Sequence, residues 1–523
     1  MKFGTRVSAI AVTLLAALAM PGSLAAQDQD QDQDKDKRHH HHRHHHYQLI
    51  DMGTFGGPNS SFIGPPPELR LLNNSGVAVG GADTSTPDPA SCWNNDCYLS
   101  YGFKWQDGVV HKLDALPGFN SSFTYSVNDS GQVAGGSENG IDPLTGSPAL
   151  EAILWGKDGS LTDLGTLGGY ESSTNAVNSR GQVAGEAMNT IPDPYTSNFF
   201  NFLLTGATQV HAFRWTKSQG MQDLGTLPGG NDSAAASINE RGQIAGWSFT
   251  NTTVNSTTGT PTNDPFLWDD GKMIDLGTLG GTSGRVGSLN NRGQVAGNSN
   301  LAGDQSCHPF LWDKTGGMKD LGTLGGDSGL AFFVSDAGEV VGKTNLPGVL
   351  GCDAFTPGHG FLWKNGVMTD LGSPAGDPCS EADVINSKHQ IVGYGWDCQT
   401  QFPSPVYHAF LSEDGDPGVD LNTMIPPNPG LQLNFAFYIN DPGEIAAVGT
   451  LSNGDIHAFV LIPCDENHAD VEGCDFSEIE VAGPETAASA TQYPAAPRSP
   501  INPLSQFRAS RNRRFGTQQP AAK

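Results

Sequence analysis

The sequence has few basic residues and no long apolar segment beyond residue 20. Lysine and arginine number 28 against 55 aspartate and glutamate residues, which gives a formal net charge of −27. Because so acidic a chain repels phosphate groups, we expect no nucleic-acid partner. A transmembrane helix needs roughly 18 consecutive apolar residues, and no segment after residue 20 meets that requirement, so we expect no membrane span.

Motifs that carry chemistry are also missing. The glycines punctuate turns, and none of them forms a phosphate-binding loop that opens a helix. Carboxylates are abundant, but no pair of them departs from the repeated pattern described below, so no general acid and base can be chosen. We therefore assign no catalytic residue and no required cofactor.

What the sequence does contain is a repeat, which is clearest in residues 264–299. Its four short apolar runs, at 265–268, 272–276, 286–289 and 294–296, are bounded by Gly, Asn or Asp, which is typical of β-strands. An Asn-x-x-Gly joint between the last two runs favours a tight hairpin, because Asn can bond its own backbone two residues on and Gly adopts the left-handed conformation. We interpret one unit as a four-stranded antiparallel meander.

Each part of the unit occurs eight times. The first run recurs at Phe103, Ile153, Phe213, Phe266, Phe310, Phe361, Phe410 and Phe459. The aspartate of the second run recurs at Asp51, Asp114, Asp163, Asp223, Asp275, Asp320, Asp370 and Asp420. The hairpin joint recurs at Asn73, Asn128, Asn178, Asn239, Asn290, Ser335, Asn386 and Asn440.

The repeat region starts and ends out of phase. It enters at a second run, residues 47–54, and leaves at a first run, residues 457–462. Pairing these two segments in one sheet would hide the edge strands at which a ring begins and ends. We therefore predict an all-β fold: a β-propeller of four-stranded antiparallel blades, with eight blades closed by pairing of the N- and C-terminal strands.

The repeat resembles a known family. The tripeptide His-Ala-Phe occurs at 211–213, 408–410 and 457–459, together with copies of Asp-Leu-Gly-Thr-Leu-Gly-Gly and Gly-Gln-Val-Ala-Gly. These motifs resemble the HAF family of extracellular repeat proteins over residues 47–463. The resemblance implies secretion and a repeat architecture, and it implies no activity.

The histidine before the first run admits two interpretations. It could contribute to a ring of metal ligands, or it could start a strand and bond a neighbouring backbone. We favour the second, because three of the eight copies lack it, and we expect the recurring aspartate to accept amides of a turn or of the neighbouring blade. The histidines concerned are His211, His308, His359, His408 and His457.

The linkers that vary in length all fall between the fourth run of one unit and the first run of the next. Equivalent linkers of a ring lie on one face, and variable loops on a constant scaffold often bind ligands. The longest of these inter-blade linkers, residues 186–210, carries four aromatic candidates for stacking on sugar rings or gripping a partner. These are Tyr195, Phe199, Phe200 and Phe202; the alternative is that they pack on a neighbouring blade.

Eight cysteines in a chain with the marks of secretion favour disulfides over metal sites. Proximity along the chain suggests three bonds and leaves two cysteines in successive linkers. The suggested pairs are Cys92–Cys97, Cys379–Cys398, Cys464–Cys474 and, from those linkers, Cys307–Cys352.

Segments of different composition flank the propeller, to which we assign residues 47–475. Residues 1–26 resemble a signal peptide, so we expect a secreted protein, extracellular or periplasmic. Residues 27–46 form a Gln/Asp- and His-rich tether, and residues 476–523 a disordered tail containing Ala, Pro and Arg. The tether either captures zinc, nickel or copper as a function, or it is a flexible solvated segment that binds divalent metal adventitiously, as any run of histidines does. Its histidines are His39, His40, His41, His42, His44, His45 and His46.

Three functions remain open from the sequence. The first is a binding or interaction scaffold for carbohydrate or protein, acting as a monomer through the linker-loop face. The second is a lyase or hydrolase acting on polysaccharide, which would need two suitably placed carboxylates if it hydrolysed glycosides. The third is a structural cell-envelope protein.

Overall fold

The computed structural model describes residues 46–62, 69–88, 98–141, 148–193, 208–256, 258–352, 356–399 and 406–465. These residues form β-strands and two short 3₁₀ turns, η1 (Pro374–Gly376) and η2 (Leu421–Thr423). Within these ranges no helix is long and apolar enough to cross a bilayer. The predicted all-β class is confirmed.

The strands form antiparallel units of four. The first three units in chain order contain β2 (Gly56–Ser61), β3 (Ala78–Pro87), β4 (Tyr98–Gln106), β5 (Val109–Leu113); β6 (Ser122–Val127), β7 (Val133–Ile141), β8 (Pro148–Trp155), β9 (Leu161–Gly165); and β10 (Ser172–Val177), β11 (Val183–Pro192), β12 (Thr208–Thr216), β13 (Gly220–Asp223). The next two contain β14 (Ser233–Ile238), β15 (Ile244–Val254), β16 (Pro261–Asp269), β17 (Lys272–Asp275); and β18 (Gly280–Leu289), β19 (Val295–Leu301), β20 (Cys307–Asp313), β21 (Gly317–Asp320). Two more contain β22 (Gly329–Val334), β23 (Val340–Asn345), β24 (Gly358–Lys364), β25 (Val367–Asp370); and β26 (Cys379–Ile385), β27 (Gln390–Trp396), β28 (Tyr407–Glu413), β29 (Val419–Asp420). The last combines β30 (Leu431–Ile439), β31 (Ile445–Leu451) and β32 (Ile456–Pro463) with β1 (Tyr47–Asp51).

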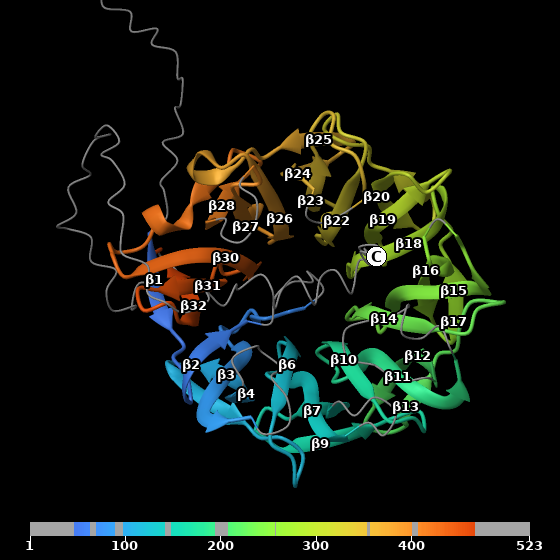
Figure 1. Ribbon diagram of the computed structural model, residues 1–523, viewed down its shortest axis with the longest axis horizontal. Helices are drawn as coiled ribbons and strands as arrows, with labels where there is room; N and C mark the ends of the chain where they lie inside the picture. Colours follow the sequence, from blue (N-terminus) through green and yellow to red (C-terminus); the bar gives the residue numbers. More distant parts are fainter. Residues whose placement is uncertain are drawn as a thin grey trace, which may run out of the picture. The chain divides into compact units, whose positions relative to one another are not determined.

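These units follow one another around a common centre in chain order (Figure 1). Six of them are separate four-stranded sheets. The units β14–β17 and β18–β21 are joined into one eight-stranded sheet by a single parallel bridge between Asn263 and Ser283. In the units that begin with β6, β10, β14 and β30, the first strand lies nearest the centre, and β1, β9, β13 and β17, which carry the repeated aspartate, lie at the periphery (Figure 1).

The sheets are offset by two strands from the repeat seen in the sequence. In residues 264–299 the first two runs lie in β16 and β17, whereas the last two lie in β18 and β19 of the following unit. The prediction that one repeat forms one meander was therefore wrong in its boundaries, because periodicity marks strands without saying which neighbours pair. As a consequence the variable linkers join the second and third strands of one sheet, as β11 and β12 show, and are not inter-blade connections.

The N- and C-terminal strands share one sheet, as predicted. β1 pairs antiparallel with β32, from Tyr47 opposite Pro463 to Asp51 opposite Phe459. The C-terminal strand also contacts the next unit, since the Ala458 N–H donates to the Ser60 hydroxyl at 3.1 Å. The two ends of the repeat region are thus held together by backbone pairing and by a side chain.

One glycine of the Val-Ala-Gly run is required by close packing. A Cβ atom on Gly185 would lie 2.0 Å from the carbonyl oxygen of Ser173 on the inner strand, where the β10–β11 register shifts. The same Cβ atom would lie 3.0 Å from the ring of Phe213, which is fully buried. Burying each such phenylalanine contributes roughly 1.5–3 kcal/mol, so the glycine–phenylalanine pairing explains why both residue types recur.

Candidate functional site

The repeated joints form a series of hydrogen bonds that we call the asparagine belt. In seven of eight joints the side-chain amide donates to the backbone carbonyl of the next joint, and the last of these bonds returns from the C-terminal unit to the first. The bonds run from Asn73 to Asn128 (2.9 Å), Asn128 to Asn178 (2.8 Å), Asn178 to Asn239 (3.0 Å), Asn239 to Asn290 (3.0 Å), Asn290 to Ser335 (2.8 Å), Asn386 to Asn440 (2.9 Å) and Asn440 to Asn73 (2.9 Å). Only Ser335 has no amide to donate.

Local chemistry explains why asparagine fills these joints. The Asn239 side-chain oxygen accepts the N–H groups of Arg241 and Gln243, both at 3.0 Å, which closes the turn. The Asn239 amide then donates to the Gln243 side chain at 2.8 Å and to the neighbouring unit. The predicted bond from asparagine to its own backbone two residues on is confirmed, and the bond to the next unit could not be seen in the sequence.

Next to the belt lies a cavity of about 460 Å³, lined by residues of all eight units. Its charged lining comprises five carboxylates against one guanidinium, Arg70, and one imidazole, His389. The carboxylates are Asp129, Glu240, Asp336, Glu339 and Asp441. The cavity is therefore acidic, and it favours neutral or cationic ligands over anionic ones.

Neighbouring joints hold several of these carboxylates in place. The Asn291 N–H donates to Asp336 at 2.8 Å, and the Ser387 N–H donates to Asp441 at 3.0 Å. Burial raises the pKa of Asp441, but hydrogen bonds from Ser387 and Asn74 and the nearby charge of Arg70 outweigh burial and lower the pKa overall. Asp441 is therefore ionised at neutral pH.

Arg70 organises one side of the cavity. Its guanidinium pairs with Asp129 and hydrogen-bonds Tyr438. Burial lowers the pKa of Arg70, but Tyr438 and Asp129 raise it overall, so the guanidinium stays charged. Burial raises the pKa of Tyr438, which keeps the phenol protonated and able to donate.

On another side of the cavity three residues depart from the repeat. Ser335 replaces the belt asparagine, Glu339 replaces the glutamine found four residues later in five of the other seven joints, and His389 replaces the glycine of the next joint. The Glu339 carboxylate contacts His389 Nδ1 at 2.9 Å and Lys364 Nζ at 2.7 Å. Burial raises the pKa of Glu339, but Lys364 and His389 lower it overall. This cluster was missed from the sequence, although a His in a Gly position signals it.

The cavity lining differs between two halves of the molecule. The regular half comprises β6 to β21, and the divergent half comprises β22 to β32 with β1 to β5. At the position two residues before the joint, the regular half has the small residues Ser126, Ala176, Ser237 and Ser288. The divergent half has the larger residues Phe333, Val384 and Tyr438 at that position in the cavity lining. The aromatic, cationic and imidazole groups of the cavity therefore gather on one side.

The recurring histidines lie away from the cavity, on the outer strands. Nδ1 of four of them lies 2.8–3.0 Å from the oxygens of the repeated aspartate: His211–Asp223, His308–Asp320, His359–Asp370 and His457–Asp51. His408 instead contacts Asp377 at 2.8 Å. The expected bond to neighbouring backbone occurs at His359, which also hydrogen-bonds the backbone of Pro378. The contact with aspartate was not expected, and it arises because cross-strand placement brings a carboxylate within reach.

The repeated aspartate also caps a turn, as predicted. Asp223 accepts the Gly225 N–H at 2.7 Å while it contacts His211. Burial raises the pKa of Asp223, but these two bonds outweigh burial and lower it overall. No group of three or more metal-ligating side chains occurs in the described part of the chain.

Two copies carry an acid where others carry histidine. Asp264 faces Asp275, and burial together with the charge of Asp275 raises the pKa of Asp264 to about 6. Burial likewise raises the pKa of Glu151, and the hydrogen bond from Asn139 does not offset burial and nearby Asp163. Each pair must share a proton or tolerate two like charges.

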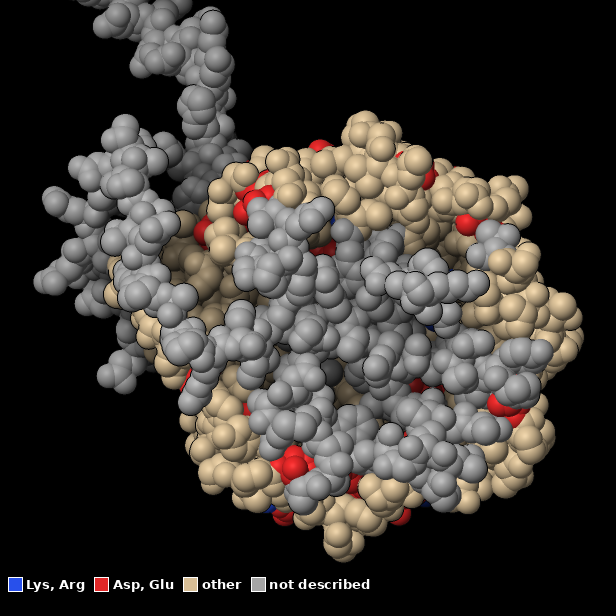
Figure 2. Space-filling model, viewed as in Figure 1, with Lys and Arg blue, Asp and Glu red and all other residues tan. Residues whose placement is uncertain are grey.

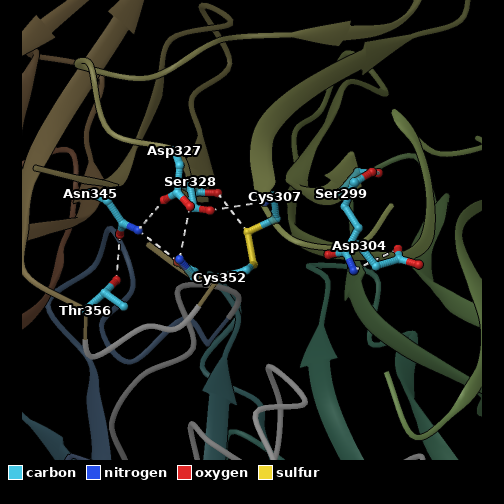
Figure 3. Close-up of a disulfide and its surroundings, with 11 residues drawn as sticks. Ser299, Asp304, Cys307, Asp327, Ser328, Asn345, Cys352 and Thr356 are labelled. Atoms are coloured by element: carbon cyan, nitrogen blue, oxygen red, sulfur yellow. Dashed lines mark hydrogen bonds between the residues drawn. A yellow bond between two sulfur atoms is a disulfide. The ribbon is translucent and has the colours of Figure 1, made fainter. Parts of the chain in front are cut away.

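Two predicted disulfides are present. Cys307 on β20 bonds Cys352, and this bond joins two neighbouring units; Cys379 on β26 bonds Cys398 within one unit. Figure 3 shows the first bond beside Asn345, whose amide donates to Asp327 at 3.1 Å. Cys464 is also disulfide-bonded. Its expected partner Cys474, and the pair Cys92 and Cys97, lie outside the described residues.

Other predicted site residues also fall outside the described ranges. They are the linker aromatics Tyr195, Phe199, Phe200 and Phe202, and the tether histidines apart from His46. His46 lies at the start of β1, where its carbonyl accepts the Cys464 N–H at 2.8 Å. Figure 2 shows Asp and Glu side chains spread around the visible described surface, with little Lys or Arg, as the net charge requires.

Comparisons with known proteins assign no function. No protein-family model matches the chain, and no curated protein matches it. Among solved structures, a PL25 ulvan lyase has 11% identity and a TM-score of 0.37, covering 79% of this chain and 95% of that one. A puromycin hydrolase has 13% identity and a TM-score of 0.36, covering 77% and 62%. TolB from Acinetobacter baumannii has 12% identity and a TM-score of 0.28, covering 64% and 79%. Similarity at these levels carries no argument about the site.

Proposed function

We propose that this chain is a secreted, closed eight-bladed β-propeller that binds a carbohydrate partner as a scaffold. The closed ring is supported by the eight four-stranded units, by the shared terminal sheet and by a belt that returns from Asn440 to Asn73. Secretion is supported by the two disulfides between described cysteines. The resemblance to the HAF repeat family is part of this proposal.

The observation that carries the binding function is the gathering of repeat-breaking residues around one cavity. Scaffold positions repeat from unit to unit, whereas Arg70, Phe333, Tyr438 and His389 each occur once at their position. All four line the cavity together with Glu339. Departures from a locally consistent pattern are expected where function opposes stability. A cavity with aromatic groups and a few convergent polar groups is the usual form of a small-ligand site.

Saccharide suits this lining better than a protein segment or an anionic polymer. Phe333 and Tyr438 offer ring surfaces, while carboxylates and amides offer acceptors for hydroxyl groups. The acidic lining opposes uronic or sulfated sugars. The linker-loop face, at the opposite end of the strands, remains a second candidate surface for a protein partner.

A polysaccharide-acting lyase or hydrolase is the second candidate function. The single observation that favours it is the contact of Glu339 with His389 in the same cavity as Tyr438, since imidazole, carboxylate and phenol groups serve as general acids and bases. Mass spectrometry of retained glycans would reveal cleavage. Intact glycans after prolonged incubation would leave the scaffold function alone.

A glycan array probed with the secreted full chain tests the proposal. We expect neutral or amine-bearing glycans to be retained over uronic and sulfated ones, and retention to fall in Phe333→Leu and Tyr438→Phe variants. Val367→Thr is the control, because Val367 is exposed on the outermost strand of the sheet that holds Phe333. Retention of no glycan, or equal retention by all variants, would overturn the proposal.

A further inference from the structure

His389 occupies a backbone position that glycine fills in the other seven joints. Its φ angle is +60°, and the glycines at the equivalent positions have φ between +69° and +103°. These glycines are Gly76, Gly131, Gly181, Gly242, Gly293, Gly338 and Gly443. A side chain in this region costs roughly 1–2 kcal/mol, so glycine is the more stable choice and His389 is retained at a cost.

The neighbouring joint changes in two matching ways. Ser335 in place of asparagine leaves the Asn386 carbonyl without the side-chain donor that the other joints receive from the belt, and Glu339 stands where Gln132, Gln182, Gln243 and others stand in the repeat. Glu339 directs its carboxylate to His389, whereas those glutamines accept the belt amide. The joints at Ser335 and Asn386 therefore lack the belt amide bond between them and have instead a contact between the Glu339 carboxylate and the His389 imidazole at the cavity.

This contact fixes which nitrogen of the neutral imidazole carries the proton. Glu339 is ionised, and Lys364 secures its other oxygen at 2.7 Å. A carboxylate at 2.9 Å from Nδ1 requires a proton on that nitrogen. In the neutral ring Nε2 is then an acceptor, and within the described residues it has no hydrogen-bond partner. His389 is about one-third exposed and lines the cavity.

We propose that Glu339 and His389 determine ligand specificity in the cavity, with Nε2 accepting a hydrogen bond from a hydroxyl or amino group of a saccharide that carries no acidic group. This inference rests on the proposed binding function and identifies its recognition residues. The surrounding Asp336 and Asp441 are also acceptors, so the cavity demands a donor-rich ligand. An anionic sugar would bring acceptors and negative charge to a site that already has both.

The test is titration calorimetry of the full chain with three tetrasaccharide probes of different charge. They are the N-acetylglucosamine tetramer (neutral), the glucosamine tetramer (cationic) and the galacturonic acid tetramer (anionic). We expect binding of the neutral or cationic probe and none of the anionic probe. His389→Gly should weaken that binding about tenfold, the loss expected for one good hydrogen bond, while the melting temperature stays level or rises.

The control must relieve positive φ without touching the cavity. Asp270, with φ of +48° in the turn between β16 and β17, provides it: Asp270→Gly should raise stability and leave affinity unchanged. Glu339→Gln should weaken binding a few-fold, since the amide holds the imidazole less firmly. A purely structural role for His389 predicts unchanged affinity in His389→Gly.

The outcomes separate this inference from the function on which it depends. Unchanged affinity in His389→Gly, with affinity lost in Tyr438→Phe, would overturn the role of His389 and leave the cavity as the binding site. Preferred binding of the anionic probe would overturn the specificity assigned to the cavity. Failure of all three probes together with an empty glycan array would overturn both proposals.

Discussion

The regular and divergent halves are built from the same kind of four-stranded unit, but they differ in the residues at the joints. In the regular half every joint is an asparagine with a following glycine and glutamine, and the cavity-lining residue two positions before each joint is small. In the divergent half one belt asparagine and one glycine are replaced, three of the four joints lack the glutamine, and aromatic residues face the cavity. The difference teaches that the joint that lacks the belt amide, at Ser335, is also the joint whose Glu339 contacts the imidazole of His389.

The outer strands show the reverse distribution. Histidine–aspartate pairs occur in both halves, but the two acid pairs, Glu151 with Asp163 and Asp264 with Asp275, lie in the regular half. The regular half therefore has the same residues at each of its joints but different residue pairs on its outer strands. This contrast indicates that the residues of the joints and those of the outer strands vary independently of each other.

The largest expected effect concerns the disulfide that joins the two halves. Cys307 lies in the regular half and Cys352 in the divergent half, at a sequence separation of 45. Replacing both by serine should lower the free energy of unfolding by about 4 kcal/mol, because the bond restricts a long loop in the unfolded chain. Urea denaturation without reductant measures the loss.

The disulfide within one unit provides the comparison. Cys379 and Cys398 are separated by only 19 residues, so replacing them should cost about 0.8 kcal/mol less on loop entropy alone. An equal or larger loss for the shorter loop would show that the contact between halves adds no stability beyond that of a local staple.

The asparagine belt gives the next prediction. Asn239→Ala removes two side-chain donor bonds and two turn acceptor bonds from a buried position, and should cost about 1–3 kcal/mol. Ser335→Ala removes one bond from the Glu339 N–H and should cost less than 1 kcal/mol. Thermal unfolding of both variants measures the difference.

Restoring the missing amide sharpens the same comparison. Ser335→Asn supplies a donor toward the Asn386 carbonyl and should stabilise the chain by about 0.5–1.5 kcal/mol. Destabilisation by Ser335→Asn, or equal losses in Asn239→Ala and Ser335→Ala, would mean that the belt does not hold neighbouring units together.

The sequence predicted the strands well because strand chemistry is local. Short apolar runs, Asn-x-x-Gly joints and the offset between the ends of the repeat were enough to predict an all-β chain whose β1 pairs with β32. The boundaries of the units were wrong, since strand pairing depends on tertiary contacts that periodicity does not encode. The Cys307–Cys352 and Cys379–Cys398 bonds followed from position in the chain.

The candidate site was missed for a different reason. A repeated motif marks the scaffold of a repeat protein. The recurring histidines are part of that scaffold, because they bond aspartates on the outer strands. His389 and Glu339 are informative because they interrupt the pattern, and each interruption looks like drift until the fold brings the two side chains within 2.9 Å. In a repeat protein, departures at positions of special backbone geometry are therefore the better guide to function.

The smallest effect is expected at the outer acid pair of Asp264 and Asp275, and it depends on pH. The pKa of Asp264 is raised to about 6 in the folded chain, against an ordinary value of 3.8. A carboxyl whose pKa is raised on folding contributes stability that is fully present below pH 3.8 and is lost as the pH rises through about 6.

Asp264→His should supply the histidine found at His211 and allow the bond to aspartate seen there at 2.9 Å. We expect a gain of about 1 kcal/mol at pH 7.5 that shrinks as the pH falls below 6. The reverse change, His211→Asp, should destabilise the chain by a similar amount at pH 7.5, because it places a second carboxylate beside Asp223. Melting temperatures of the two variants and the parent from pH 4 to pH 8 measure both effects. If the melting temperatures of all three proteins changed with pH in parallel, the pair of Asp264 and Asp275 would not titrate as assigned. The charge at this position on the outer strands of the regular half would then have no effect on stability.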